Sequence, residues 1–148
     1  MQVCKEASTK LTMTFTINLY RHCPKNRYRF ALGKMSDNPL IYLGLNPSMG
    51  EDTTPNRTGR RIMHFAEREG FSGFLLINLS AQRALTPPEL HKRQNRQMMA
   101  ENHRVIAEIF SAVSRPKMLL GYGNNIELRP YLLESFKTIM THFYLAKG

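Results

Sequence analysis

The stretch "LIYLGLNPSMG" (residues 40–50) decides the fold class of this chain, because it joins an apolar strand to a polar turn. The run before Gly44 is almost continuously apolar, which is typical of a strand covered on both faces of its sheet. After the glycine, Asn46 is followed directly by Pro47. Proline fixes its own φ and keeps the preceding residue out of the α region, so this turn is stiff. The stretch therefore predicts an α/β sheet with Asn46 held at the end of one strand.

Helices and strands alternate from this stretch onwards. The predicted strands are continuous apolar runs, and the predicted helices have apolar residues at the helical period. In chain order, we predict a strand at residues 40–45, a helix at 60–69, a strand at 73–78, a helix at about 95–114, a strand at 117–123, a helix at 126–136 and a strand at 142–146. Such alternation predicts a three-layer α/β/α sandwich with a mostly parallel four-stranded sheet.

The N-terminal part predicts additional strands. Residues 11–20, "LTMTFTINLY", alternate strictly between apolar and polar side chains, as a half-buried strand does. Residues 27–34 predict a second strand that could pair with the first in antiparallel orientation. Met13 could serve as an alternative start of translation, so residues 1–12 are interpreted as a dispensable extension. No linker or repeat interrupts the chain, and residues 1–148 are predicted to form a single domain.

The net charge of the chain indicates which kinds of ligand it attracts. The chain has 21 Lys and Arg against 11 Asp and Glu, a formal net charge of +10. This excess favours nucleic acid, a nucleotide or another acidic ligand, although a generally basic soluble protein fits the charge equally well. No apolar run approaches the roughly 18 residues of a membrane span, and no signal peptide is recognisable. The two cysteines, Cys4 and Cys23, provide no disulfide framework. We expect a cytoplasmic protein that does not bind membranes.

Two predicted strands end in asparagine. Asn46 follows the first buried strand, and Asn78 ends the strand "GFLLIN". In parallel α/β sheets, ligands bind beyond the carboxyl ends of the strands, so both amides are candidate ligand contacts. A carboxamide offers one acceptor and two donors, which suits the edge of a nucleobase. The alternative for Asn46 is that its side chain bonds to its own backbone, as asparagine often does in turns.

Basic residues gather at the start of the first predicted helix. Arg57, Arg60 and Arg61 stand there beside Thr58, and cations at that position oppose the helix dipole. They predict an anion site, or, alternatively, ion pairs with nearby acidic residues: Glu51, Asp52, Glu67 and Glu69. A second basic run contains Lys92, Arg93 and Arg96. It could follow a phosphate backbone or form an ordinary solvated surface. The five histidines have no metal-ligand spacing, and we predict neither a metal nor a cofactor.

Four segments together resemble a known family: "LIYLGLNPSMG", "GFLLINLSAQRAL", "ENHRVIAEI" and "KMLLGYG". In this order they resemble an uncharacterised bacterial and phage family with a GLNPS segment (domain of unknown function 1643). The resemblance covers most of residues 27–144. More distantly, the same segments look like the uracil-DNA glycosylase superfamily, in which a Gly-x-Asn-Pro segment orients the attacking water and a strand ending in asparagine contacts the flipped base.

This resemblance implies a DNA-glycosylase-like site that hydrolyses the N-glycosidic bond of a modified or mismatched base. Asn46 would orient the water. The implied contacts to the base are Asn78, Leu45 and Pro47. The implied contacts to phosphates are Ser48, Arg57, Thr58, Arg60, Arg61 and Arg83.

One feature of both families has no counterpart here. Their members carry a His-Pro segment after the last strand, whereas His142 stands at the start of the last predicted strand of this sequence, not after it. The alternative function is therefore a non-catalytic module that binds DNA or a protein through a degenerate glycosylase-like site.

Overall fold

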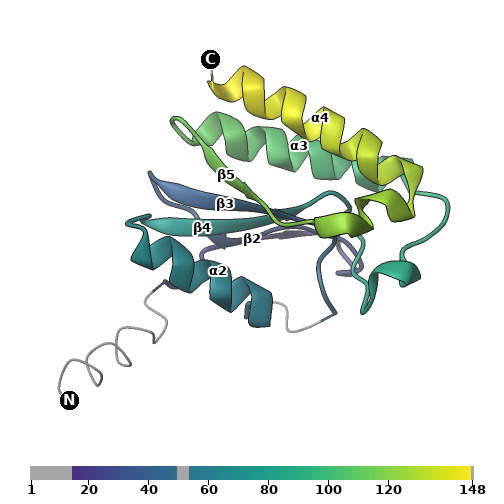
Figure 1. Ribbon diagram of the computed structural model, residues 1–148, viewed down its shortest axis with the longest axis horizontal. Helices are drawn as coiled ribbons and strands as arrows, with labels where there is room; N and C mark the ends of the chain where they lie inside the picture. Colours follow the sequence, from purple (N-terminus) through teal and green to yellow (C-terminus); the bar gives the residue numbers. More distant parts are fainter. Residues whose placement is uncertain (1–14, 50–53, 148) are drawn as a thin grey trace.

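The computed structural model describes residues 15–49 and 54–147. It contains a five-stranded sheet with the strand order β1-β2-β4-β3-β5 and helices on both faces (Figure 1). The strands are β1 (Leu19–His22), β2 (Arg29–Lys34), β3 (Pro39–Gly44), β4 (Gly73–Asn78) and β5 (Lys117–Leu120). The α-helices are α2 (Arg57–Arg68), α3 (Arg96–Ala112) and α4 (Pro130–Lys147), and the short 3₁₀ helices are η1 (Pro87–Glu89) and η2 (Gly123–Leu128).

The sheet is mixed, so the prediction of a mostly parallel four-stranded sheet is wrong. β3 pairs in parallel with β4 and β5, whereas β1 with β2 and β2 with β4 are antiparallel. The reason is that the N-terminal hairpin extends the sheet along the free edge of β4. The predicted antiparallel pairing of the two N-terminal strands is confirmed, as is the α/β class.

The C-terminal segment is helical where a strand was predicted. Residues 142–146 lie within α4, which begins at Pro130, a favoured first residue of a helix. The side chains of α4 that are buried follow the helical period: Tyr131, Leu132, Ser135, Ile139 and Phe143. A short apolar run such as "HFYLA" fits a buried helix segment as well as a strand, so its length alone could not separate the two.

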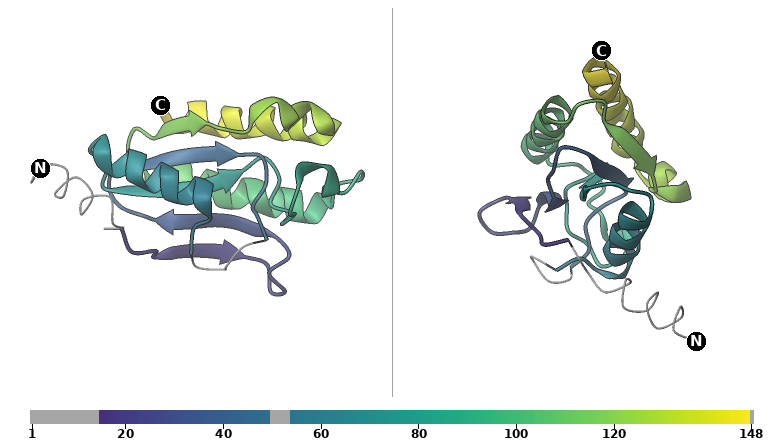
Figure 2. Two further views of the ribbon diagram at one scale, coloured as in Figure 1. Left: turned by 60° about the horizontal axis from the view of Figure 1, so that its bottom comes forward. Right: turned by 90° about the vertical axis from the view of Figure 1, so that its left-hand side faces the viewer.

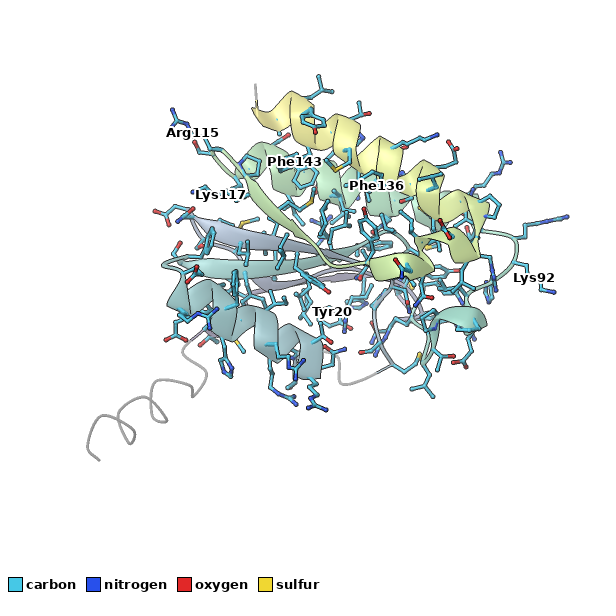
Figure 3. All side chains as sticks on the ribbon, in the orientation of Figure 1. Tyr20, Lys92, Arg115, Lys117, Phe136 and Phe143 are labelled. Atoms are coloured by element: carbon cyan, nitrogen blue, oxygen red, sulfur yellow. The ribbon has the colours of Figure 1, made fainter. Side chains whose placement is uncertain are left out.

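Two apolar clusters hold the layers together, one on each face of the sheet. Along β4, Phe74 packs in the cluster beneath α2, and Leu75 packs in the cluster beneath α3 and α4. Figure 2 shows α2 on one side of the strands and the pair α3 and α4 on the other. Phe143 of α4 meets Phe110 of α3 with ring centroids 5.4 Å apart, and Figure 3 places Phe143 between these helices. Burial on both faces explains the continuous apolar runs of β3 and β4.

The N-terminal strand is shorter than predicted. β1 begins at Leu19, and residues 11–14 of the predicted strand lie outside the described residues. Phe15 and Ile17 nevertheless pack against the cluster beneath α2, in agreement with the alternating pattern. The side chain of Asn18 accepts from the N–H of Met35 at 2.7 Å and donates to its carbonyl at 3.1 Å, which fixes this segment beside the end of β2.

Candidate functional site

A cavity of about 180 Å³ lies at the carboxyl ends of the parallel strands β3 and β4. Its walls come from these strand ends, from the turn after β3, and from the start of α2. The lining residues are Arg29, Tyr42, Gly44, Leu45, Asn46, Pro47, Ser48, Asn56, Thr58, Gly59, Leu76, Asn78 and Gly121. The two predicted amides, Asn46 and Asn78, therefore line one cavity, together with four further predicted residues: Leu45, Pro47, Ser48 and Thr58.

The register of the sheet creates this cavity. Gly44 is paired with Asn78, so β3 and β4 end at the same level. A Cβ atom at position 44 would lie only 2.7 Å from Oδ1 of Asn78, closer than packed atoms approach. The strand ends in glycine because any side chain there would occupy the space into which the Asn78 amide extends.

Asn78 is held from its backbone and leaves its side chain available. Its carbonyl accepts a 3.0 Å hydrogen bond from Nδ2 of Asn102 on α3. The residue is only 9% exposed, yet its carboxamide makes no hydrogen bond with the described part of the chain. Among the described residues, the side-chain atoms that are fully buried without a partner are Nε2 of His64 and Oδ1 of Asn102, so the Asn78 carboxamide keeps contact with the open cavity. This amide is the strongest indication of a ligand in the cavity.

Asn46 is fixed through its amide nitrogen. Nδ2 donates to the carbonyl oxygens of Pro47 at 3.0 Å and Ala84 at 3.3 Å. The alternative role, bonding to the local backbone, is thus partly realised. With Nδ2 occupied in this way, Oδ1 has no partner within residues 15–49 and 54–147 and remains an acceptor in a defined orientation.

The turn after β3 is tied to the segment after β4. The N–H of Ser80 donates to the carbonyl of Leu45 at 2.9 Å, and the N–H of Ala84 donates to that of Pro47 at 3.2 Å. Arg83 donates through Nε to the carbonyl of Ser48 and through Nη1 to that of Asn26, both at 3.2 Å. Arg83 does not line the cavity, and it acts here as an anchor of the turn. Its predicted contact with phosphate stays a prediction.

The N-terminus of α2 faces the same cavity. The side chain of Asn56 caps the helix by accepting from the N–H of Gly59 at 2.9 Å, and the first helical bond runs from the N–H of Arg60 to the carbonyl of Asn56. The N–H groups of Arg57 and Thr58 therefore have no partner within the helix. Because Thr58 lines the cavity, the positive end of the helix dipole lies at its edge.

The three arginines predicted at this helix start do not line the cavity. All are exposed, and Arg60 donates through Nη1 to the carbonyl of Pro55 at 3.1 Å. Arg57 and Arg61 form no ion pair with any residue that the structure describes, while Glu69 pairs with Arg68. The acidic partners at positions 51 and 52 lie outside the described residues. Whether these arginines bind phosphate stays a prediction.

Arg29 is a cavity residue that the sequence analysis missed. It is 6% exposed, although arginine is rarely buried. The extra residue Phe30 in β2 positions it: Arg21 pairs with Ala31 and His22 with Arg29, so strict alternation is broken at this bulge. Bulges redirect side chains in this way. The available signal was a cation at the head of an otherwise apolar run, "RFAL".

Tyr42 supplies an aromatic wall. Its hydroxyl donates to the carbonyl of Gly121 at 3.0 Å, and burial raises the pKa of Tyr42 above its usual value. The phenol is therefore protonated at neutral pH and already engaged, which leaves the ring as an apolar surface.

The chemistry of the lining is neutral and cationic. None of the described lining residues is a carboxylate or an imidazole. Within the ranges that the structure describes, no three or more His, Cys, Asp or Glu side chains form a group that could hold a metal ion. The site can donate and accept hydrogen bonds and can stabilise negative charge.

By its fold and its site, the chain is thus an α/β protein with a polar cavity at the carboxyl ends of its parallel strands. The chain belongs to the family described as Protein of unknown function (DUF1643), whose model matches residues 27–142. This match confirms the resemblance to that family, and it spans the cavity from Arg29 to Gly121. No curated protein and no solved structure matches the chain. The more distant resemblance to the uracil-DNA glycosylase superfamily stays a prediction.

Among the helices of the described residues, none combines the length and the apolar character required to span a bilayer.

Proposed function

We propose that this chain is a nucleic-acid-binding or nucleotide-binding protein that receives one base in the cavity and hydrolyses its N-glycosidic bond. The observation that carries the proposal is the carboxamide of Asn78, which lines the cavity and forms no hydrogen bond with residues 15–49 and 54–147. A nucleobase edge presents adjacent donors and acceptors, and it would satisfy this amide. The cavity volume of about 180 Å³ is below the roughly 300–1,000 Å³ of sites for drug-sized ligands, which suits a single base with its sugar and phosphate outside.

Each lining residue has a role in this proposal. Oδ1 of Asn46 accepts a hydrogen bond from the attacking water and fixes its direction, because Nδ2 is already tied to Pro47 and Ala84. Leu45 and Pro47 give apolar contacts to the base. Phosphates next to the base lie at the edge of the cavity, within the field of the residues at the start of α2.

The reaction needs no strong base in the site. The bond from the anomeric carbon to the base nitrogen breaks, its electron pair leaves with the base, and the water oxygen bonds to the anomeric carbon. The proton released by the water ends on the departing base or in bulk water. Negative charge develops on the base, and the N-terminus of α2 at the edge of the cavity supplies positive potential.

The test uses labelled oligonucleotides that carry uracil, mismatched or modified bases, with abasic products revealed by alkaline cleavage. We expect the parent protein to form abasic product from at least one of these substrates. Asn46→Ala should lower the rate of cleavage by about 100-fold, in the range found when one positioned polar group is removed. Asn124→Ala, a substitution of an exposed asparagine outside the cavity, is the matched control and should leave the rate unchanged. Absence of product with every substrate would overturn the hydrolytic function.

A second candidate is a module that binds nucleic acid or a protein without catalysis. The observation that favours it is the lining itself, in which the described residues include no carboxylate or imidazole to transfer a proton. This candidate predicts salt-dependent binding to DNA. Asn46→Ala should leave this binding intact, whereas charge reversal at Arg57, Arg60 and Arg61 should abolish it. Binding without base release, measured on the same oligonucleotides, would favour it over hydrolysis.

A further inference from the structure

A second and larger depression lies next to the cavity. It has a volume of about 920 Å³ and is lined by Lys25, Asn26, Arg27, Tyr28, Met49, Gln82, Arg83, His91, Arg93, Gln94 and Asn95. The turn after β3 contributes to both sites, because Ser48 lines the cavity and the next residue, Met49, lines the depression. The turn after β3 therefore separates a ligand in the depression from the cavity.

The depression continues past the segment 91–95. A neighbouring hollow of about 730 Å³ shares Arg93 and Gln94 with it and adds Lys92, Arg96, Pro130, Tyr131 and Glu134. We call the two together the basic groove, defined by these lining residues. It extends from the turn between β1 and β2 to the start of α4.

Most cations of this groove lack an acidic partner among the described residues. Five of them are exposed and form no ion pair with the described residues: Lys25, Arg27, Lys92, Arg93 and Arg96. Elsewhere, Arg21 and Arg104 are paired with glutamates. The groove lining contains one carboxylate, Glu134, which itself pairs with Lys137 at 3.7 Å. The groove therefore carries a net positive potential that attracts a polyanion.

The segment that presents these cations is held rigidly. Arg129 donates to the carbonyls of Pro88 at 3.1 Å, Leu90 at 2.8 Å and His91 at 3.3 Å. The hydroxyl of Tyr131 also donates to the His91 carbonyl, at 2.6 Å. A rigid segment loses little conformational entropy when it binds, so these bonds prepare Lys92 and Arg93 for a ligand.

We infer that the basic groove binds single-stranded nucleic acid and leads one base of the strand into the adjacent cavity. The inference rests on the nucleic-acid part of the proposed function, not on hydrolysis. Single strands bind in concave, positively charged grooves with aromatic platforms, and Tyr28 offers such a platform in the lining. Elements that read duplex DNA are instead convex and enter its major groove. A single strand also delivers its base without the cost of opening a pair.

The experiment measures fluorescence anisotropy of an unmodified labelled oligonucleotide, single-stranded and as the matching duplex, over a series of salt concentrations. Two double variants are compared. The groove variant combines Lys92→Gln and Arg93→Gln, and the control variant combines Arg115→Gln and Lys117→Gln. Both remove two exposed cations, and Figure 3 places Lys92 and the pair Arg115 and Lys117 at opposite ends of the molecule. Thermal unfolding of both variants verifies that each is folded.

The groove variant should bind the single strand at least about tenfold more weakly at low salt, and its log–log salt slope should fall by about 1.4. The control variant should bind within about twofold of the parent. Tyr28→Ala should lower the affinity by roughly tenfold through loss of stacking. Equal losses in the two double variants, equal or tighter binding of the duplex, or no binding at low salt would each overturn the inference.

The outcomes also separate this inference from the hydrolytic proposal. If the parent binds single strands through the groove but releases no base from any substrate, hydrolysis fails and the groove stands. If the parent releases a base while removal of the groove cations leaves single-strand binding unchanged, the groove fails and hydrolysis stands.

Discussion

Asn78 presents a carboxamide that forms no hydrogen bond with the part of the chain that the structure describes. Its backbone carbonyl is bonded to Asn102, and Gly44 opens space in front of its side chain. Such a residue weakens the folded state relative to an apolar one of similar size. A binding site often keeps groups of this kind at the expense of stability. Asn78 and Asn102, which donates to the Asn78 carbonyl, should therefore change the free energy of unfolding in opposite directions when each is replaced by leucine.

We expect Asn78→Leu to raise the free energy of unfolding by up to about 1 kcal/mol, since it replaces a mostly buried carboxamide that forms no hydrogen bond with the described residues. Asn102→Leu should lower it by about 1–3 kcal/mol, because the Asn78 carbonyl would lose its donor. Urea denaturation of both variants checks this difference. A loss of stability in Asn78→Leu as large as in Asn102→Leu would indicate that the Asn78 amide serves the fold rather than a ligand.

The elements behind the cavity are joined by a buried chain of hydrogen bonds. Nε2–H of His103 on α3 donates to Oγ of Ser135 on α4 at 2.8 Å, and that hydroxyl donates to the carbonyl of Leu79 at 2.6 Å, just after β4. Burial, together with a smaller effect of the nearby His142, lowers the pKa of His103 to about 4, so the imidazole is neutral at neutral pH. Helices α3 and α4 are thus tied to the strand end that carries Asn78.

The lowered pKa of His103 predicts a pH dependence of stability. The unfolded chain binds a proton at His103 near its ordinary pKa of 6.5, whereas the folded chain binds it only near pH 4. The contribution of His103 to the free energy of unfolding is therefore complete above about pH 6.5 and decreases as the pH falls towards 4. Urea denaturation across this range, with His103→Gln for comparison, should show a shallower decrease for the variant. Identical pH profiles would exclude His103 as the cause.

The molecule as a whole carries more positive charge than its ion pairs balance. The formal net charge is +10, and the ion pairs of the described residues all lie at the surface. Self-repulsion of this kind destabilises the compact state and is screened by salt. The arrangement of the exposed cations also matters, because Lys25, Arg27, Lys92, Arg93 and Arg96 share one groove.

We expect the thermal midpoint to rise as potassium chloride increases from low to moderate concentration, because screening relieves repulsion among the unpaired cations. The double variant Lys92→Gln with Arg93→Gln should show a smaller rise in the thermal midpoint, since it removes two cations of the basic groove. Scanning calorimetry measures both. A midpoint that falls with added salt would mean that the surface ion pairs outweigh the repulsion.

Much of this architecture was predictable from local patterns. β4 was predicted with its observed bounds, and Asn46 and Asn78 were predicted to lie at strand ends. Pairing partners were harder, because the side-chain pattern of β2 does not specify which edge it joins. The final strand was wrong because "HFYLA" fits either period. Arg29 was missed because its place in the cavity depends on a single extra residue in a neighbouring position of β2.

That extra residue has a consequence for how the cavity could change over generations. Phe30 interrupts the alternation of β2, and Arg29 lines the cavity beyond the interruption. We expect that deleting the codon of Phe30 would restore regular alternation and turn the Arg29 side chain towards the opposite face of the sheet, while every other lining residue keeps its identity. A change in the length of β2 would therefore alter the charge of the cavity lining, although no residue of the lining would be substituted.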